Sequence, residues 1–351
     1  MKEGFRKLHR ATVLSLLVLA FVLLEGCYYV QAFNGQMEVL RKRRPVSEVI
    51  ADEKTDEELR RRLEMVQEAR QFGVDELLLP ENNSYRSYTD LGRDYVVWNV
   101  FAAPEFSLTP KEWCYPIAGC VAYRGYFAEE KAARKAGNLE KDGFDVYVGG
   151  VAAYSTLGRF DDPVLNTMMH WSDSNLVETL FHELAHQKLY VSGDTAFNES
   201  FATAVAEFGI ERWRSKKNLY HSPGNGDRSG ALLETVRQMI AQSRLELENI
   251  YSSGDSDEKK RAEKAETLNK LSDDAQAAID ASGLEVENWL APPLNNARLA
   301  SSGVYESHLP AFRKLLVECD LVIACFYDKS SGLADLDYDL RQKRLAEINS
   351  R

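Results

Sequence analysis

The segment 173–194 constrains the fold most, because its apolar residues repeat with the period of an α-helix. Asp173 or Ser174 can cap the start of this helix, and Gly193 can end it. Apolar residues at intervals of three and four form a continuous stripe along one side of a helix; here they are Leu176, Val177, Leu180, Phe181, Leu184 and Leu189. We therefore expect an amphipathic helix that buries this stripe in a core.

Two histidines lie beside the apolar stripe of this expected helix. His182 and His186 are four residues apart, so they differ by about 40° around the helix and about 6 Å along it. Two imidazoles placed in this way can bind one ion, and zinc accepts neutral imidazole nitrogen. Glu183 completes the pattern His-Glu-x-x-His and could act as general base on a water in the open position of such a site. The alternative is an amphipathic helix whose histidines only border its polar face.

A second helix is expected to follow, capped by Asp194 or Thr195. Its first turns contain Glu199, in the sequence Asn-Glu-Ser-Phe-Ala that begins twelve residues after His186. Zinc accepts one carboxylate beside two imidazoles. We therefore predict one Zn²⁺ per chain, bound by His182, His186 and Glu199. The alternative for Glu199 is a solvated carboxylate in the first turn, where the helix dipole favours negative charge.

The first 26 residues have the pattern of an export signal. An uncharged run, 11–24, follows a positively charged start; the charges are Lys2, Arg6, Lys7 and Arg10. Residues 24–27, Leu-Glu-Gly-Cys, resemble the lipobox of bacterial lipoproteins, with a glutamate where that motif usually has a small or uncharged residue. We expect lipidation of Cys27 and a mature chain that is anchored in the bacterial cell envelope and faces the periplasm. The alternative is an uncleaved anchor that extends to Val30.

The cysteines agree with an oxidising compartment. Removing Cys27 as the lipid site leaves an even number, Cys114, Cys120, Cys319 and Cys325. Close spacing favours Cys114 with Cys120 and Cys319 with Cys325, although four cysteines permit three connectivities. Buried free thiols are the alternative.

The charge of the chain limits its partners. Lys and Arg number 43 against 54 Asp and Glu, which gives a formal net charge of −11. Removal of residues 1–26 deletes four positive and two negative charges, so the mature chain carries −13. A generally basic nucleic-acid-binding surface is therefore excluded, and we expect no nucleic-acid partner.

The remaining pattern predicts a predominantly helical α+β fold. Short apolar and β-branched runs between residues 95 and 153, separated by Pro, Gly and charges, indicate a small mixed sheet. From Ser174 onward the pattern is almost wholly helical. After the signal, we predict a single domain over 27–351, in which the small mixed sheet lies over the metal helix. Its parts are an N-terminal helical segment (27–94), the sheet with the metal-binding helices (95–220) and a helical C-terminal part (221–351).

The two motifs carry a family resemblance. His-Glu-Leu-Ala-His from His182, followed by Asn-Glu-Ser-Phe-Ala from Asn198, resembles the gluzincin metallopeptidases. Over most of the mature chain, the sequence is similar to a bacterial family described as putative aminopeptidases, which are often predicted lipoproteins. The resemblance implies a zincin-like metallopeptidase core. It also implies that His182, His186 and Glu199 are zinc ligands and that Glu183 is the general base.

Other site residues are predicted on weaker patterns. Enzymes of the gluzincin type bind substrate as an added strand at a sheet edge, and the segment 148–156, Val-Gly-Gly-Val-Ala-Ala-Tyr-Ser-Thr, could be that edge. An ordinary buried strand and turn is the alternative. Candidate donors for the developing oxyanion are Tyr154, Tyr305 and His308, each of which could instead be a residue at the boundary of the core.

These patterns predict a zinc-dependent peptidase that hydrolyses peptide substrates with Glu183 as general base. The family resemblance implies that this peptidase is an aminopeptidase. The chain lacks a recognisable glycine-rich segment for a free substrate amine, so endopeptidase activity stays open. The competing hypothesis is a non-catalytic, metal-binding envelope lipoprotein that acts as an assembly or interaction scaffold. A structural zinc site would have no use for Glu183. The sequence makes no prediction of oligomeric state.

Overall fold

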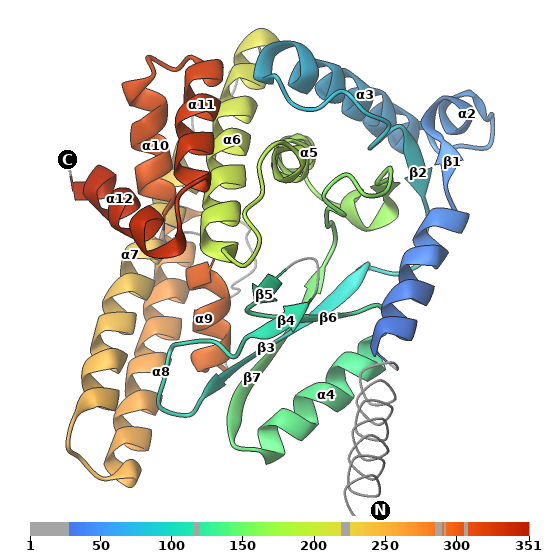
Figure 1. The fold of residues 1–351 in the computed structure, drawn as a ribbon. Helices are drawn as coiled ribbons and strands as arrows, with labels where there is room; N and C mark the ends of the chain where they lie inside the picture. Colours follow the sequence, from blue (N-terminus) through green and yellow to red (C-terminus); the bar gives the residue numbers. More distant parts are fainter. Residues whose placement is uncertain are drawn as a thin grey trace, which may run out of the picture.

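The computed structural model describes residues 28–115, 119–218, 225–284, 290, 293–304 and 308–350 (Figure 1). Helices make up 62% of the structure and the strands form small sheets, so the fold is α+β as predicted. Cys27 and Tyr305 lie outside the described residues. None of the helices in the described ranges is both long enough and apolar enough to cross a membrane.

Helices α5 (Asp173–Lys188) and α6 (Thr195–Lys216) contain the two motifs and pack directly on each other. The side chain of Ser172, one residue before the expected caps, accepts a hydrogen bond from the amide of Asn175 at the start of α5. The side chain of Asp194 caps α6 by accepting from the amide of Phe197. Helix α5 ends earlier than expected, and Gly193 lies in the following turn with a φ of +83°.

The strands form three small sheets, where the sequence pattern predicted one. The largest is antiparallel with the order β6-β3-β7; its strands are β3 (Val97–Pro104), β6 (Arg124–Tyr126) and β7 (Phe144–Val151). A mixed sheet has the order β1-β2-β8; its strands are β1 (Arg44–Pro45), β2 (Ser87–Thr89) and β8 (Val164–Leu165). Most strands are only two or three residues long, so each of these pairings involves few residues.

The third sheet is the hairpin of β4 (Trp113–Tyr115) and β5 (Gly119–Val121). A disulfide joins Cys114 to Cys120 across this hairpin, in a directly opposed pair of residues. A second disulfide joins Cys319 to Cys325 between two C-terminal helices. Both pairings are the ones that the sequence spacing favoured.

The sheet β6-β3-β7 lies between two helical layers. Helix α4 (Glu129–Lys141) covers the face that contains Val100 and Ala102, and α5 and α6 lie on the side of the opposite face (Figure 1). A helix over residues 28–41 runs along the outer edge of β6. There the side-chain amide of Gln31 donates to the carbonyl of Gly125 and accepts from the amide of Phe127, as a neighbouring strand would.

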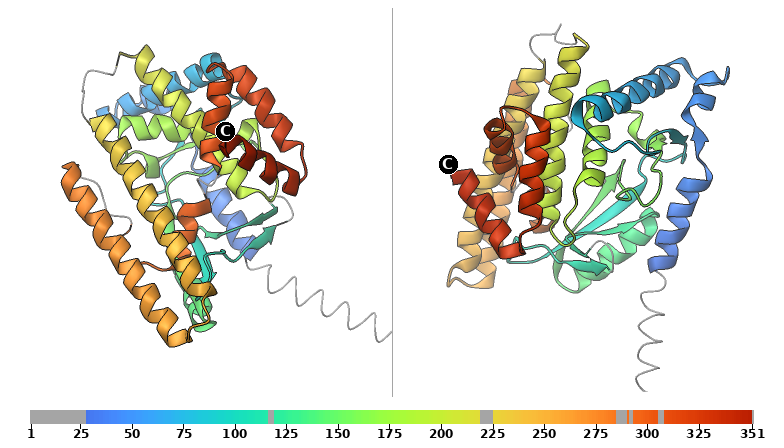
Figure 2. Two further views of the ribbon diagram at one scale, coloured as in Figure 1. Left: turned by 90° about the vertical axis from the view of Figure 1, so that its left-hand side faces the viewer. Right: turned by 45° about the horizontal axis from the view of Figure 1, so that its top comes forward.

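The remaining helices surround α6 and the sheet. Their bounds are α2 (Val46–Ala51), α3 (Glu57–Leu77), α7 (Asn225–Ser252), α8 (Asp257–Ser282), α9 (Asn296–Val304), α10 (Leu309–Glu318), α11 (Ile323–Ala334) and α12 (Tyr338–Ser350). Helices α7 and α8 form a long hairpin at the end of the sheet away from helix 28–41 (Figure 2). One large hydrophobic cluster joins α3, α5, α6, α10, α11 and α12, so the C-terminal helices complete the core around the motif helices.

A buried ion pair fixes the start of α6 to α12. The guanidinium of Arg341 donates to the carboxylate of Asp194 at 2.8 Å, and these side chains are 5% and 3% exposed. Arg341 also donates to the carbonyls of Leu336 and Ala334. Because the same aspartate caps α6, the pair connects the C-terminal helix to the helix that carries Glu199.

We predict that Arg341→Met lowers the free energy of unfolding by about 3–5 kcal/mol, because it leaves the carboxylate of Asp194 buried without its charge partner. The control is Arg344→Met on the same helix, where the pair with Glu347 is 56% and 40% exposed. Arg344→Met should lower the free energy of unfolding by no more than about 0.5 kcal/mol. Urea unfolding followed by circular dichroism measures both, and equal effects would contradict a special role for the buried pair.

Candidate metal centre

Helices α5 and α6 bring three potential metal ligands together. The Nε2 atoms of His182 and His186 are 3.1 Å apart, one helical turn from each other on α5. Oε2 of Glu199, on α6, lies 3.2 Å from Nε2 of His182 and 3.7 Å from Nε2 of His186. Among the described residues, these three form the one group of His, Cys, Asp and Glu ligand atoms close enough to hold an ion.

The dimensions of this group fit a zinc ion. Ligands at 2.0–2.1 Å from a tetrahedral ion stand about 3.3 Å apart, and the three observed separations fall on both sides of that value. Two imidazole nitrogens and one carboxylate oxygen are a ligand set that zinc accepts, with a fourth position left open. The nitrogen atom Nδ1 of His186 is buried without a hydrogen-bond partner, so the polar contacts of this ring within the ligand group are made through Nε2.

The charges at the group favour an ionised Glu199. Burial by itself would raise the pKa of this carboxyl, but the charge of His186 and hydrogen bonds from both imidazoles outweigh burial and hold the pKa well below its ordinary value. An ionised carboxylate that is only 13% exposed provides the negative charge that a cation needs.

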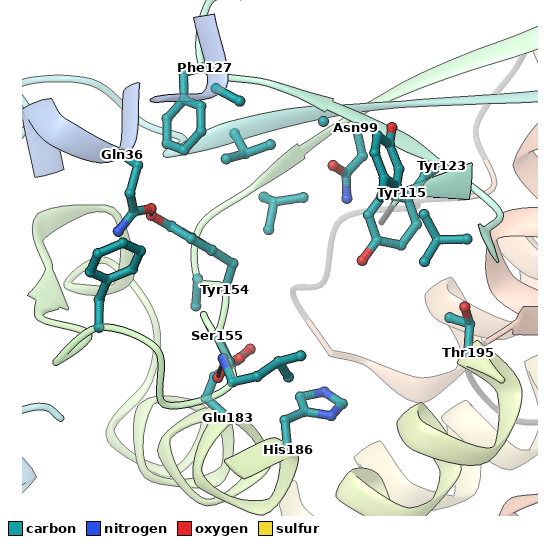
Figure 3. Close-up of a pocket in the computed structure, with 18 of the residues that line it drawn as sticks. Gln36, Asn99, Tyr115, Tyr123, Phe127, Tyr154, Ser155, Glu183, His186 and Thr195 are labelled. Carbon is teal, nitrogen blue, oxygen red and sulfur yellow. Dashed lines mark hydrogen bonds between the residues drawn. The ribbon is translucent and has the colours of Figure 1, made fainter. Parts of the chain in front are cut away.

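Glu183 lies next to the ligand group but outside it. Its side chain points into the cavity from α5, and the residue is 8% exposed (Figure 3). The pKa of this carboxyl is raised to about 7: burial is the main cause, the charges of Glu199 and Asp162 contribute, and His182 opposes the rise. A carboxyl whose pKa is near neutrality can both accept and donate a proton, as a general acid or base must.

The three ligands and Glu183 line one side of a cavity of about 810 Å³. Strand β3, the β4–β5 hairpin and residues around β6 form the side facing α5 and α6 (Figure 3). Helix 28–41 and the loop after β7 form further walls. Many lining residues are aromatic or aliphatic; examples are Tyr28, Phe33, Met37, Tyr115, Val121 and Phe127. The cavity can therefore hold a ligand of several residues with bulky apolar groups.

The three predicted oxyanion donors have different positions. Tyr154 lines the cavity, but its hydroxyl donates a hydrogen bond to Oε1 of Gln36 (Figure 3). His308 caps α10 and does not line the cavity; its amide donates to the hydroxyl of Ser200. Tyr305 lies outside the described residues. Of the three, the structure thus brings only Tyr154 to the cavity.

A tyrosine that the sequence analysis missed lies near the ligand group. Tyr123, between β5 and β6, lines the cavity. Burial raises the pKa of its hydroxyl, and the charges of Glu199 and Glu183 raise it further, so the hydroxyl keeps its proton as a hydrogen-bond donor. Nothing in the local sequence pattern distinguishes Tyr123 from the chain's other tyrosines, because its place depends on how two strands pair.

The predicted substrate edge, 148–156, is a strand only as far as Val151. The following residues form a loop whose members Ala153, Tyr154 and Ser155 line the cavity. Strand β7 is an outer strand of its sheet, and the carbonyl of Val146 on its free side accepts a hydrogen bond from the side chain of Asn295. The segment thus reaches the cavity mainly as loop.

Comparison with known proteins identifies a family. No curated protein and no solved structure matches the chain. A protein-family model described as "Putative aminopeptidase" matches residues 27–345, which include the whole ligand group and nearly all of the structure described above. The chain therefore belongs to this family.

Proposed function

We propose that the chain is a zinc-dependent peptidase of the gluzincin type, and an aminopeptidase as the description of its family suggests. The observation that carries this proposal is the triangle of His182, His186 and Glu199, with separations of 3.1, 3.2 and 3.7 Å and a buried Glu183 beside it. The packing of α5 and α6 beside an antiparallel sheet supports a zincin-like core.

In this proposal, the ligand group holds the metal and Glu183 moves the proton. Zinc bound by such a group supplies Lewis-acid activation of a peptide carbonyl and of water. The carboxylate of Glu183 takes a proton from the attacking water and then gives it to the nitrogen of the leaving amine. Its pKa of about 7 suits both directions of transfer, because neither protonation state is strongly favoured near neutral pH.

Tyr123 is a candidate residue for stabilising the transition state. Its hydroxyl is close enough to Glu183 and Glu199 for their charges to raise its pKa, and it lies in the same cavity. A protonated hydroxyl in a site of low polarity can donate a hydrogen bond to the oxygen of the peptide carbonyl as negative charge develops there.

We predict that Glu183→Gln lowers kcat for peptide hydrolysis by about 10²–10⁴-fold, because it removes the general base and leaves the ligand group intact. Zinc content, measured by mass spectrometry, and the circular dichroism spectrum should match those of the parent protein. A peptide library with free amino termini, analysed by mass spectrometry of the products, supplies the substrates.

Glu178→Gln is a matched control, because this residue is also a partly buried glutamate of α5 but does not line the cavity. It should change kcat less than threefold. Full hydrolysis by the zinc-loaded Glu183→Gln protein would contradict the peptidase proposal and favour a metal-binding scaffold.

Tyr123→Phe should lower kcat for peptide hydrolysis, while its zinc content stays the same as that of the parent protein.

We further propose that the protein is anchored by a lipid on Cys27 and faces the periplasm. Two disulfides support an oxidising compartment. The lipobox-like sequence directly precedes helix 28–41, so the anchor would join the folded chain at the wall of the cavity.

We predict that Cys27→Ser, expressed in a bacterium with its signal, moves the protein from the membrane fraction to the soluble periplasmic fraction. Acylation contributes about 0.8 kcal/mol for each buried methylene, and the variant loses this contribution. Fractionation followed by immunoblotting measures the shift. If the parent protein shows no acyl group on its amino-terminal peptide by mass spectrometry, the anchor proposal is wrong.

A further inference from the structure

Asn99 is a polar residue in an otherwise apolar central strand. It lies in the middle of β3, in the sequence Val-Trp-Asn-Val-Phe-Ala-Ala. Asparagine is depleted in strands, and a buried position in a sheet normally has a β-branched or aromatic side chain. An asparagine within such an apolar run is a sequence signal for a polar group with a specific role.

The side chain of Asn99 is largely buried, and its amide points into the cavity. The residue is 7% exposed and lines the cavity, and Figure 3 shows it on the sheet side, with Glu183 and His186 on the helix side. No residue in the described ranges forms a hydrogen bond with this amide, whereas buried amides normally have partners. Neither amide atom is among the fully buried, unpartnered side-chain atoms, so the amide stays accessible from the cavity. Such a group is expected to be retained for a ligand.

The neighbouring strands leave room beside Asn99. Its cross-strand neighbours are Gly125 on β6 and Gly149 on β7. A Cβ atom at Gly125 would lie 3.0 Å from Val97 and 3.1 Å from Oδ1 of Asn99, closer than ordinary side-chain contacts. The glycine therefore keeps the asparagine oxygen uncovered. Glycine in a strand is typical of places where another chain approaches the backbone closely.

We propose that Asn99 binds a backbone peptide group of the substrate, at a peptide bond other than the one that is cleaved. An asparagine amide presents one acceptor and two donor hydrogens side by side, so it can pair with the carbonyl and the N–H of a peptide chain. Because Asn99 and Glu183 are on opposite sides of the cavity, the two residues engage different parts of an extended peptide. This inference rests on the proposed peptidase function and adds that the site selects peptides over single amino-acid amides.

The first test compares release of the amino-terminal residue from a longer substrate, Phe-Ala-Ala-amide, followed by chromatography of the products, with its release from a shorter one, Phe-aminomethylcoumarin, which has a single amide bond. Asn99→Leu keeps the approximate volume of the side chain but removes both hydrogen-bonding groups. It should lower kcat/KM for the longer substrate about 10- to 100-fold, and for the shorter substrate less than threefold. An equal effect on both substrates, or no effect on either, would overturn the proposal.

A structural role for Asn99 is tested with a second buried asparagine. Asn296 is fully buried, accepts from the hydroxyl of Tyr251 and donates to the carbonyls of Pro104 and Glu105. Asn296→Leu should lower the melting temperature, because the Tyr251 hydroxyl and the two carbonyls lose their hydrogen bonds with Asn296. Asn99→Leu should leave the melting temperature unchanged or raise it, since an unpartnered amide becomes apolar. A large decrease for Asn99→Leu would mean that the residue supports the fold.

Binding separates this inference from the peptidase proposal. In the Glu183→Gln background, isothermal titration calorimetry with Ala-Ala-Phe-amide measures peptide affinity without hydrolysis. Asn99→Leu should weaken that affinity about 10-fold or more even if the parent protein shows no hydrolysis. Asn99→Asp keeps an acceptor but loses the donors, so it should also weaken binding. Ala-Ala-Phe-amide has a free α-amine. If Asn99→Asp binds this peptide more tightly than the protein that keeps Asn99, the group bound at residue 99 is the α-amine, and the proposal is overturned.

Discussion

The close packing of α5 on α6 is the constraint on which the rest of the structure depends. Three ligand atoms can approach within 3.7 Å only if the two helices come close together. Gly209 permits this approach, because a Cβ atom there would lie 2.7 Å from the ring of Phe181 and 2.6 Å from Leu77. Ala202 and Ala206, both fully buried or nearly so, keep the same helix narrow. The small residues of α6 thus hold an anionic carboxylate beside two imidazoles.

The parts of the fold far from the ligands act on the site through the ends of these helices. Asp194 caps α6 five residues before Glu199 and is held by Arg341 from α12. The sheet contributes from the opposite side, where Tyr123 and Asn99 face the same cavity. Helix 28–41 adds a wall and, through Gln31, occupies the outer edge of β6. A site assembled in this way combines a rigid charged side with a mostly apolar side.

Local patterns predicted the parts of the structure that depend on nearby residues. The amphipathic repeat and the His-Glu-x-x-His spacing predicted α5, and the cap at Asp194 was one of two expected for α6. The two disulfides join cysteines six residues apart, a separation at which sequence spacing is informative. Tyr123 was missed because its position follows from strand pairing across a long interval. The division into three small sheets was also missed, since pairs such as Tyr88 with Val164 join distant segments.

The most direct test of the account is the metal content of the purified protein and of Glu199→Ala, measured by inductively coupled plasma mass spectrometry after dialysis. Glu199 is the critical ligand, because it alone comes from α6 and depends on the packing of the two helices. We predict close to one zinc per chain in the parent protein and strong loss of zinc in the variant, with the helical content of both unchanged. A parent protein that neither contains zinc nor takes it up, or equal zinc in both proteins, would contradict the three-ligand site.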